Sequence, residues 1–347
     1  ENLTAGGVVI DLYAGWAQEL DAGGNVLSTD TILNFEAAHG SYFDDIITLA
    51  NGNNYAFGRA GDDEIYGLSG NDNLIGGSGG DTLDGGANSD WASYSDDGYD
   101  GGGAAFQGAV INLALGTAID GWGDMDTLIS IENIAGSQFG DQITGDNNAN
   151  SLIGRGGNDT IIGGGGFDWL QGGSGNDSLD GGGGYDIANY KNDEYDDISI
   201  TNSSIVAHLG AVSTVSDRWG NTDTLISIER VDGSDGDDVM SADSGFAGTY
   251  GAFSEFQGMA GDDAISGNGS TRISYFSSPD GIIANLSSAA FTFADPSTTT
   301  VGPNTVLDGW GGTDSIGSGI NSLHATYADD YVLGSSADEE IQLRGGN

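Results

Sequence analysis

The segment GRGGNDTII-GGGGFDWLQ-GGSGNDSLD-GGGGYDIAN, residues 154–189, repeats one nine-residue phrase four times without a gap. Residues 58–93, GRAGDDEIY-GLSGNDNLI-GGSGGDTLD-GGANSDWAS, repeat it four more times in one phase. The shared skeleton is G-G-x-G-x-D-x-U-x, in which U is usually apolar. Glycine tolerates positive φ, so the first half of the phrase predicts a tight turn. The x-U-x half predicts a three-residue strand, whose single apolar side chain is buried only when many such strands stack.

The sixth position of the phrase places a carboxylate beside the turn. A glycine-rich turn exposes carbonyl oxygens, and a set of carboxylate and carbonyl oxygens suits Ca²⁺. The alternative is that aspartate merely favours glycine-rich turns and lies in solvent. Stacked carboxylates without a cation would repel one another, so the pattern favours several bound calcium ions.

The two runs resemble the calcium-binding nonapeptide repeats of the RTX (repeats-in-toxin) family of bacterial proteins. The resemblance implies an all-β fold in which parallel β-roll (β-helix) blocks alternate with short β-strand segments in an elongated, solenoid-like array. It implies two nonapeptides per coil, so that sixth-position residues of neighbouring coils lie about 18 residues apart. Family members leave the cell by type I secretion, which implies a secreted protein.

The predicted calcium ligands are the aspartates at the sixth position. For the outermost members of the stacks, Asp45, Asn54, Asp141 and Asn150, ion contact and a solvated side chain are both open interpretations. The full set of predicted ligands is Asp45, Asp63, Asp72, Asp81, Asp90, Asp141, Asp159, Asp168, Asp177, Asp186, Asp238, Asp263 and Asp330.

A longer unit of roughly 85–105 residues contains the short one and recurs along the chain. Each unit begins with a strand pattern such as AVINL (109–113), continues with a phrase such as DTLISIEN (126–133) and ends in nonapeptides. The strand patterns alternate apolar and polar residues, so half-buried strands are expected. Four modules are predicted: 1–94 with its roll at about 40–94, 95–190 with its roll at about 136–190, a degenerate module at 191–275, and a partial module at 276–347 in a chain expected to continue further.

The third and fourth modules depart from the pattern. In the third, only GMAGDDAIS (258–266) is a regular nonapeptide, and counting along the next phrase puts Arg272 at the sixth position. Because a guanidinium has no acceptor atom for a cation, we expect fewer ions there and a poor stack around Asp263. In the fourth module Glu339 replaces the sixth-position aspartate.

A second phrase, DGWGDMDT (120–127), recurs in related form at 217–224 and 308–315. Asp120 and Asp126 flank a glycine turn, and such a pair could hold a further calcium ion. The simpler interpretation is a polar hairpin turn with its tryptophan packed on a neighbouring sheet, since aspartate and glycine are ordinary turn residues. A third interpretation is an exposed tryptophan that stacks on carbohydrate.

The composition excludes several classes of function. The chain has 347 residues, of which 53 are acidic and 7 basic, for a formal net charge of -46. Without a basic face it is not expected to bind nucleic acid, and no segment is apolar enough to span a membrane. Cysteine is absent, as is typical of extracellular proteins stabilised by calcium instead of disulfides. We find no catalytic motif in a supporting context, since the G-x-S-x-G match at 76–80 lies inside a calcium phrase, and so we predict no enzymatic activity in this segment.

The sequence therefore predicts a calcium-binding structural segment of a secreted or cell-surface bacterial protein. An S-layer protein, an extracellular filament or an adhesin would fit, folding on calcium and assembling with itself or with other cell-surface components. The alternative is the repeat region of a secreted enzyme or toxin whose catalytic domain lies outside this segment. Fold resemblance alone does not decide between them.

Overall fold

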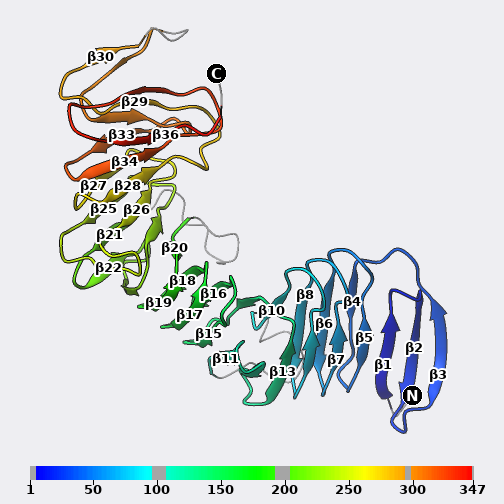
Figure 1. Cartoon of the computed structure of the whole chain (residues 1–347). Coiled ribbons are helices and arrows are strands. Elements are labelled where there is room, and N and C mark those ends of the chain that lie inside the picture. The colour runs from blue at the N-terminus through cyan, green and yellow to red at the C-terminus, as the bar shows by residue number, and fades with distance from the viewer. Residues whose placement is uncertain (1–4, 96–106, 192–203, 294–297, 346–347) are drawn as a thin grey trace. The chain divides into compact units, whose positions relative to one another are not determined.

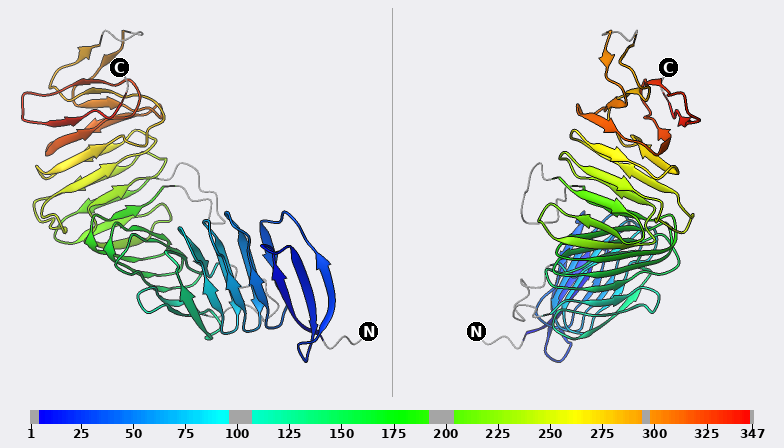
Figure 2. Two further views of the ribbon diagram at one scale, coloured as in Figure 1. Left: turned by 45° about the vertical axis from the view of Figure 1, so that its right-hand side comes forward. Right: turned by 90° about the vertical axis from the view of Figure 1, so that its left-hand side faces the viewer.

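The computed structural model describes residues 5–95, 107–191, 204–293 and 298–345. These residues form 36 strands, and no helix occurs among them (Figure 1). The chain divides into two compact units, Glu1–Asp168 (unit 1) and Trp169–Asn347 (unit 2). In each unit short strands stack into two sheets, here called A and B (Figure 2). The predicted all-β class is confirmed.

In unit 1, sheet A mixes parallel and antiparallel pairs, whereas sheet B is parallel throughout. The order in sheet A is β3 (Val26–Thr31), β2 (Trp16–Asp21), β1 (Ala5–Asp11), β5 (Ile46–Thr48), β7 (Glu64–Tyr66), β9 (Thr82–Asp84), β13 (Met125–Ile129), β12 (Thr117–Ile119), β11 (Val110–Asn112), β15 (Gln142–Thr144) and β17 (Thr160–Gly166). The order in sheet B is β4 (Ala37–His39), β6 (Tyr55–Ala60), β8 (Asn73–Ser78), β10 (Trp91–Ser93), β14 (Asn133–Ala135) and β16 (Ser151–Gly156).

Unit 2 follows the same scheme. The order in sheet A is β19 (Ser178–Gly184), β23 (Thr222–Ile226), β22 (Ser213–Ser216), β21 (Val206–Leu209), β25 (Val239–Ala242), β27 (Ala264–Ser266), β33 (Thr313–Ile316), β32 (Thr305–Leu307), β29 (Ile283–Asn285) and β35 (Tyr331–Leu333). The order in sheet B is β18 (Trp169–Ser174), β20 (Ile187–Asn189), β24 (Arg230–Asp232), β26 (Ser254–Gln257), β28 (Thr271–Ser274), β34 (Ile320–His324) and β36 (Glu340–Gln342). A separate hairpin pairs β30 (Phe291–Thr292) with β31 (Thr300–Val301).

The core of each roll is a column of apolar residues at the eighth position of the phrase. Ile47 pairs with Ile65, and Ile65 pairs with Leu83, each step being 18 residues along the chain. All three side chains are at most 1% exposed. Burying one aliphatic side chain of this size contributes about 2 kcal/mol, so the strands are stable only as a stack. The parallel β-roll predicted for the nonapeptides is confirmed.

A three-stranded meander interrupts sheet A between successive rolls. In unit 1, β13 pairs in parallel with β9 of the preceding roll, while β11 pairs in parallel with β15 of the following roll. From β9 the chain therefore skips two strand positions of sheet A to form β11, and it returns through β12 to β13 beside β9. Along β13 buried and exposed residues alternate, as predicted for half-buried strands. The meander thus joins one roll to the next through a continuous sheet.

Candidate calcium-binding ladders

Ladder A is formed by the sixth-position residues that precede the strands of sheet A. In unit 1 the backbone N–H of Asp45 donates to Asp63 Oδ1 at 2.7 Å, and that of Asp63 donates to Asp81 Oδ1 at 2.8 Å. Both bonds span 18 residues, and the three aspartates are 1% exposed. Each carboxylate therefore lies inside the stack with one oxygen bound to the preceding coil. The residue at this position of each coil, whatever its type, is called a rung below.

Ladder B is the matching set that precedes the strands of sheet B. The N–H of Asn54 donates to Asp72 Oδ1, and that of Asp72 donates to Asp90 Oδ1, both at 2.8 Å. Farther along, the N–H of Asn150 donates to Asp168 Oδ1 at 2.9 Å. The spacing of 18 residues that the family resemblance implies for neighbouring coils is present in both ladders.

The second carboxylate oxygen of the central rungs lacks a hydrogen-bond donor. Oδ2 of Asp63, Asp72, Asp81 and Asp90 in unit 1, and of Asp263 in unit 2, is buried without a partner. A buried carboxylate oxygen with neither a donor nor a cation is energetically costly. These oxygens indicate that the ladders are built to hold cations.

Glycine at the first position of the phrase leaves room beside these oxygens. A Cβ built on Gly58 would lie 2.2 Å from Asp63 Oδ2 and 2.6 Å from the carbonyl oxygen of Gly76 in the next coil. Carboxylate and carbonyl oxygens of consecutive coils therefore surround one small space. Among the described residues no three acidic or histidine side chains converge as a metal site, so carbonyl oxygens would have to complete the ligand set. Oxygen-only sets of this kind fit Ca²⁺, which would supply the positive charge that the carboxylates lack.

The electrostatics of ladder A agree with this fit. Burial, followed by the negative charge of Asp81, raises the pKa of Asp63 to about 9. Burial likewise raises the pKa of Asp81 to about 7. In ladder B, burial raises the pKa of Asp90 to about 6. A metal-free ladder near neutral pH therefore either retains protons or holds repelling charges, and a divalent cation would relieve both.

The first rung of each roll differs from the central ones, because a hydroxyl residue replaces the glycine at the second position. The Ser137 N–H donates to Asp141 Oδ2 at 2.6 Å, and its hydroxyl donates to Asp141 Oδ1 at 2.8 Å. Both oxygens of Asp141 are thus satisfied within the turn. The same arrangement joins Ser41 to Asp45, Ser234 to Asp238 and Thr326 to Asp330. These serine and threonine caps were not predicted, although the GS and AT pairs that replace GG in the sequence signal them.

Ladder A continues into the meander, an extension that the spacing of the phrase did not predict. The Asp81 N–H donates to Asp126 Oδ1 at 2.9 Å, so a residue 45 positions away provides the next rung. The hydroxyl of buried Tyr94 donates to Asp126 Oδ2 at 3.1 Å. On ladder B, Glu132 Oε2 accepts the Asp90 N–H at 2.9 Å. The shared triplet DTL, at 81–83 and 126–128, is the sequence signal for this equivalence.

In unit 2 the same continuation makes the stack around Asp263 regular, contrary to expectation. The Asp238 N–H donates to Asp263 Oδ1 at 2.8 Å, and the Asp263 N–H donates to Asp314 Oδ1 at 3.1 Å. Burial raises the pKa of Asp263 to about 8, with the charge of Asp314 as the next cause. The predicted poor stack at this position is therefore wrong for ladder A.

Ladder B of unit 2, in contrast, loses its aspartates after Asp186. Glu229 Oε2 accepts the Asp186 N–H, and the next two rungs are Ser254 and Thr271, whose hydroxyls are 2.9 Å apart. The prediction that Arg272 takes the sixth position is wrong. Ile273 pairs with Phe256 and takes the buried eighth position of the phrase. The rung, two residues earlier, is therefore Thr271. The count along the sequence fails here because the preceding turn is one residue short. Fewer calcium ligands on this edge agree with the expectation.

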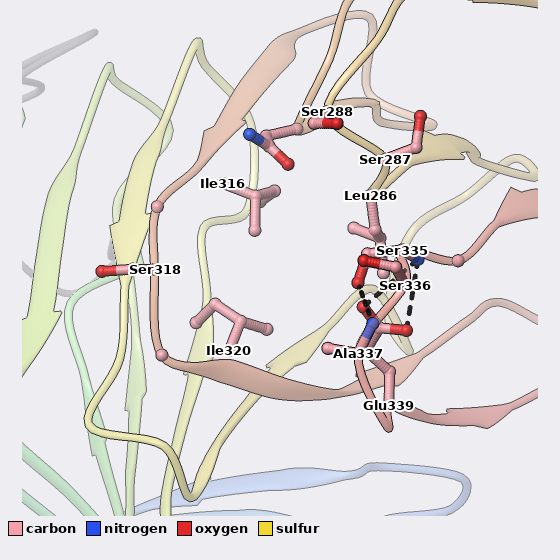
Figure 3. Close-up of a pocket in the computed structure, with 14 residues that line it drawn as sticks. Leu286, Ser287, Ser288, Ile316, Ser318, Ile320, Ser335, Ser336, Ala337 and Glu339 are labelled. Carbon is pink, nitrogen blue, oxygen red and sulfur yellow. Dashed lines mark hydrogen bonds between the residues drawn. The ribbon is translucent and has the colours of Figure 1, made fainter.

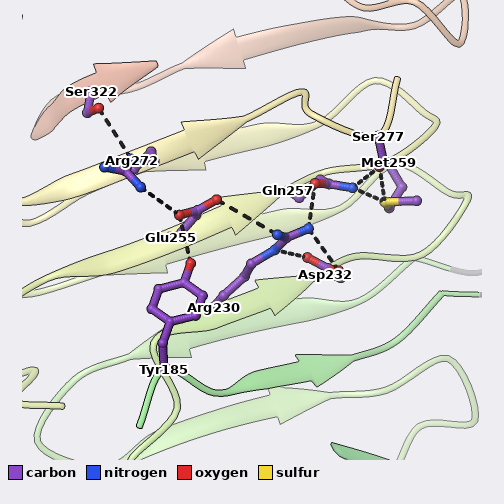
Figure 4. Close-up of polar contacts among 9 residues, drawn as sticks. All are labelled: Tyr185, Arg230, Asp232, Glu255, Gln257, Met259, Arg272, Ser277 and Ser322. Atoms are coloured by element: carbon purple, nitrogen blue, oxygen red, sulfur yellow. Dashed lines mark hydrogen bonds and ion pairs between the residues drawn. The ribbon is translucent and has the colours of Figure 1, made fainter. Parts of the chain in front are cut away.

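Ion pairs connect the strands of sheet B in unit 2 where ladder B lacks aspartates (Figure 4). Arg272 on β28 lies 3.3 Å from Glu255 on β26, and Arg230 on β24 lies 4.0 Å from the other oxygen of Glu255. Arg230 also pairs with Asp232 at 2.5 Å, and Tyr185 donates to Glu255 at 2.7 Å. The Glu255 side chain is 4% exposed. Two arginines thus connect neighbouring strands in a region where the ladder has no aspartate.

An outer row of hydrogen bonds runs beside ladder A at the fifth position of the phrase. The Asp62 N–H donates to Asp44 Oδ1, and the Gly80 N–H donates to Asp62 Oδ1, both at 2.9 Å. These residues are more exposed than the rungs, and their side chains connect successive turns without an ion. The frequent Asp or Asn at the fifth position was a visible signal for this row.

In the last module Glu339 reproduces the capping arrangement, since both of its carboxylate oxygens accept the Ser335 N–H at 3.2 Å. It borders a cleft of about 570 Å³ lined by Leu286, Ile316 and Ile320 together with several serines (Figure 3). Among the described residues, its lining contains neither a histidine nor a carboxylate besides Glu339.

The structure places every predicted ligand in one of the two ladders. Asp159, Asp168, Asp177 and Asp186 are at most 2% exposed, like the rungs described above. Trp219, in the phrase at 217–224, is half-buried. The Cζ atom of Arg218 lies 4.3 Å from the centroid of its ring. Among the described residues there is no helix long and apolar enough to cross a membrane.

Comparison with known families agrees with this geometry. A model of the RTX calcium-binding nonapeptide repeat, in four copies, matches residues 39–74, 57–92, 66–100, 130–161, 153–188 and 228–246. No match is found among the curated proteins. Repeats of this kind bind Ca²⁺ and are typical of secreted bacterial proteins. The chain therefore carries several copies of the RTX calcium-binding nonapeptide repeat.

Proposed function

We propose that this segment is a calcium-dependent structural element of a secreted or cell-surface bacterial protein, such as an S-layer protein, filament or adhesin. The supporting observation is the continuity of ladder A, which runs from Asp45 through Asp81 into Asp126 of the next module. A chain that joins module to module through its ion-binding edge is suited to an extended scaffold. We propose no catalytic role for it.

Calcium binding would couple to folding in this scaffold. Carboxylates buried without a donor oppose folding until a cation arrives, and an ion that binds only the folded state stabilises it by mass action. We expect little β-structure by circular dichroism in EGTA and full β-structure after calcium is added. A full β-signal in EGTA would contradict the proposed dependence.

An exposed sheet edge supports assembly. β3 pairs only with β2 among the described residues, and Val26 and Leu27 on it are 52% and 50% exposed. The equivalent strands of later modules, such as β13, are covered by a roll strand from the preceding module. An unpaired edge of this kind is a template for a further strand. We propose that a roll strand of a neighbouring module or copy covers β3.

Sedimentation velocity across a concentration series tests this assembly. The wild type should form larger species with calcium and none in EGTA, and Leu27→Lys should suppress them because a lysine at an edge strand opposes pairing. Leu115→Lys is the matched control, since Leu115 is 74% exposed but lies outside this edge. Equal behaviour of the two variants would argue against the edge.

The alternative function, the repeat region of a secreted enzyme or toxin, rests on the same repeats. It predicts a calcium-loaded segment that stays monomeric at high concentration, joined to a catalytic domain elsewhere in the protein. The sequence of the complete gene distinguishes the two proposals.

A further inference from the structure

The hairpin turn between β12 and β13 takes the place of a nonapeptide turn at the end of the first roll. Its Asp126 accepts the Asp81 N–H as a regular rung would, at 2.9 Å. The same junction recurs where Asp314 accepts the Asp263 N–H at 3.1 Å and where Asp223 accepts the Asp177 N–H at 2.9 Å. The three hairpins therefore close the stack of ladder A in the same way.

Each hairpin also carries an aspartate that the nonapeptide lacks, six residues before the rung. Asp120 is fully buried, and its Oδ1 accepts the N–H groups of Trp122, Gly123 and Asp124 at 2.7 to 3.0 Å. In the third hairpin, between β32 and β33, Asp308 Oδ1 likewise accepts three N–H groups at 2.6 to 3.1 Å. One oxygen of each carboxylate thus holds the turn together.

The other oxygen is left without a donor. Oδ2 of Asp120 and of Asp308 is buried and has no hydrogen-bond partner, like Oδ2 of the adjacent rungs Asp81 and Asp263. The Asp120 N–H donates to the Asp124 carbonyl oxygen, which extends the antiparallel pairing of Ala118 with Asp126 by two residues toward the turn. Because side chains two residues apart on a strand share a face, Asp120 points to the same buried face of the sheet as Ala118. Two unpartnered carboxylate oxygens therefore belong to each of these junctions.

The third hairpin shows what the free oxygen faces. A Cβ built on Gly312 would lie 3.0 Å from Asp308 Oδ2 and 1.9 Å from the carbonyl oxygen of Gly261, which is in the last nonapeptide turn of that roll. Carboxylate and carbonyl oxygens thus meet here from both sides of the junction.

The second hairpin differs in two ways. Asp217 Oδ2 receives the side-chain amide of Asn221 at 3.4 Å. Arg218 stands where the other two hairpins have Gly121 and Gly309, and its positive charge would oppose a cation beside Asp217. The chain therefore offers a comparison among its own hairpins: two have a carboxylate oxygen without a donor, and in one that oxygen accepts an amide and an arginine follows the aspartate in the sequence.

We propose that Asp120 and Asp308 each ligate a further Ca²⁺ ion at the junction between a roll and the following meander, with Asp81 or Asp263 as the second carboxylate and turn carbonyls completing the ligand set. These sites lie outside the nonapeptide stacks and bind the meander to the roll. The second junction, at Asp217, takes no ion. The inference rests on the proposed calcium dependence of the ladders.

Calcium stoichiometry, measured by equilibrium dialysis and by mass spectrometry under native conditions, tests the proposal. Asp308→Asn and Asp120→Asn should each lose one ion, because asparagine keeps the acceptor for the turn N–H groups but removes the charge. Asp217→Asn, which occupies the same hairpin position, should lose none. A gain-of-site variant, Arg218→Gly with Asn221→Gly, copies the third hairpin and should bind one ion more than the wild type.

The outcomes distinguish failure of the junction sites from failure of the proposed calcium-dependent function. A wild type that binds no calcium would overturn the proposed function itself. Wild-type stoichiometry in Asp308→Asn and Asp120→Asn, or an equal loss in Asp217→Asn, would overturn the junction sites alone. If the two loss variants fail to fold in saturating calcium by circular dichroism, the gain-of-site variant decides, and unchanged stoichiometry in it would refute the proposal.

Discussion

Replacing Asp63 by asparagine should change stability in opposite directions with and without calcium. Asparagine keeps the oxygen that accepts the Asp45 N–H but cannot carry a charge. Burial raises the pKa of Asp63 from 3.8 to about 9, so near pH 7 the folded metal-free protein must hold a proton that the unfolded chain has released. Over about 3 pH units at about 1.4 kcal/mol each, this opposes folding by about 4 kcal/mol as an upper bound.

In EGTA, Asp63→Asn should therefore raise the residual β-signal measured by circular dichroism. In saturating calcium it should instead lower the urea midpoint and weaken calcium binding in calorimetry. Asp62→Asn is the matched control, because Asp62 is the exposed neighbour with the same charge and its Oδ1 also accepts a backbone N–H. Shifts of the same sign in both media, or equal shifts in the control, would refute the reasoning about the buried carboxylate.

Three further predictions follow from the same structure. Without calcium, the segment should show more β-structure by circular dichroism near about pH 5 than near about pH 8. The raised folded-state pKa values give stability that is present below the unfolded-state pKa and lost as pH rises through the folded-state values. Calcium binding, measured by calorimetry, should strengthen over the same rise in pH. Ser137→Ala should destabilise the second roll by about 1–3 kcal/mol, since the buried Asp141 loses a donor, while calcium stoichiometry stays constant at the other rungs. Glu255→Gln should lower the free energy of unfolding in calcium, measured by urea denaturation, by about 3 kcal/mol without changing the calcium stoichiometry, because Arg230 and Arg272 lose a buried partner that no ion replaces; a loss of bound calcium would contradict this assignment.

The regular part of the site could be predicted from the sequence because its spacing is local. Asp63 and Asp81 are 18 residues apart in the sequence and adjacent in the ladder, so counting along the chain finds the contact. Counting cannot reveal a deleted residue, and for this reason Arg272 was placed one position too early. Only the pairing of Ile273 with Phe256 shows the correct register.

The junctions could not be predicted by counting, because their contacts depend on a return of the chain. Asp126 reaches Asp81 only because the meander folds back onto β9, and no fixed period relates the two residues. The buried state of Asp120 was equally invisible, since an aspartate before a glycine turn is usually solvated. The ion pairs of Glu255 depend on three strands that are neighbours in space and not in sequence.

The return of the chain at each meander also has a consequence for the rate of folding. A coil within a roll closes a loop of 18 residues, whereas the contact between Asp81 and Asp126 closes one of 45 residues. The difference in chain entropy is about 0.8 kcal/mol per junction, before the two additional strands of the meander are ordered. Rolls should consequently form first as short-range zippers, and the junctions should form later as separate nucleation events. Mixing the unfolded chain with calcium should then produce a fast phase from the rolls and a slower phase from the meanders. The repeat length within a roll and the loop length between rolls would thus give one chain two different folding rates.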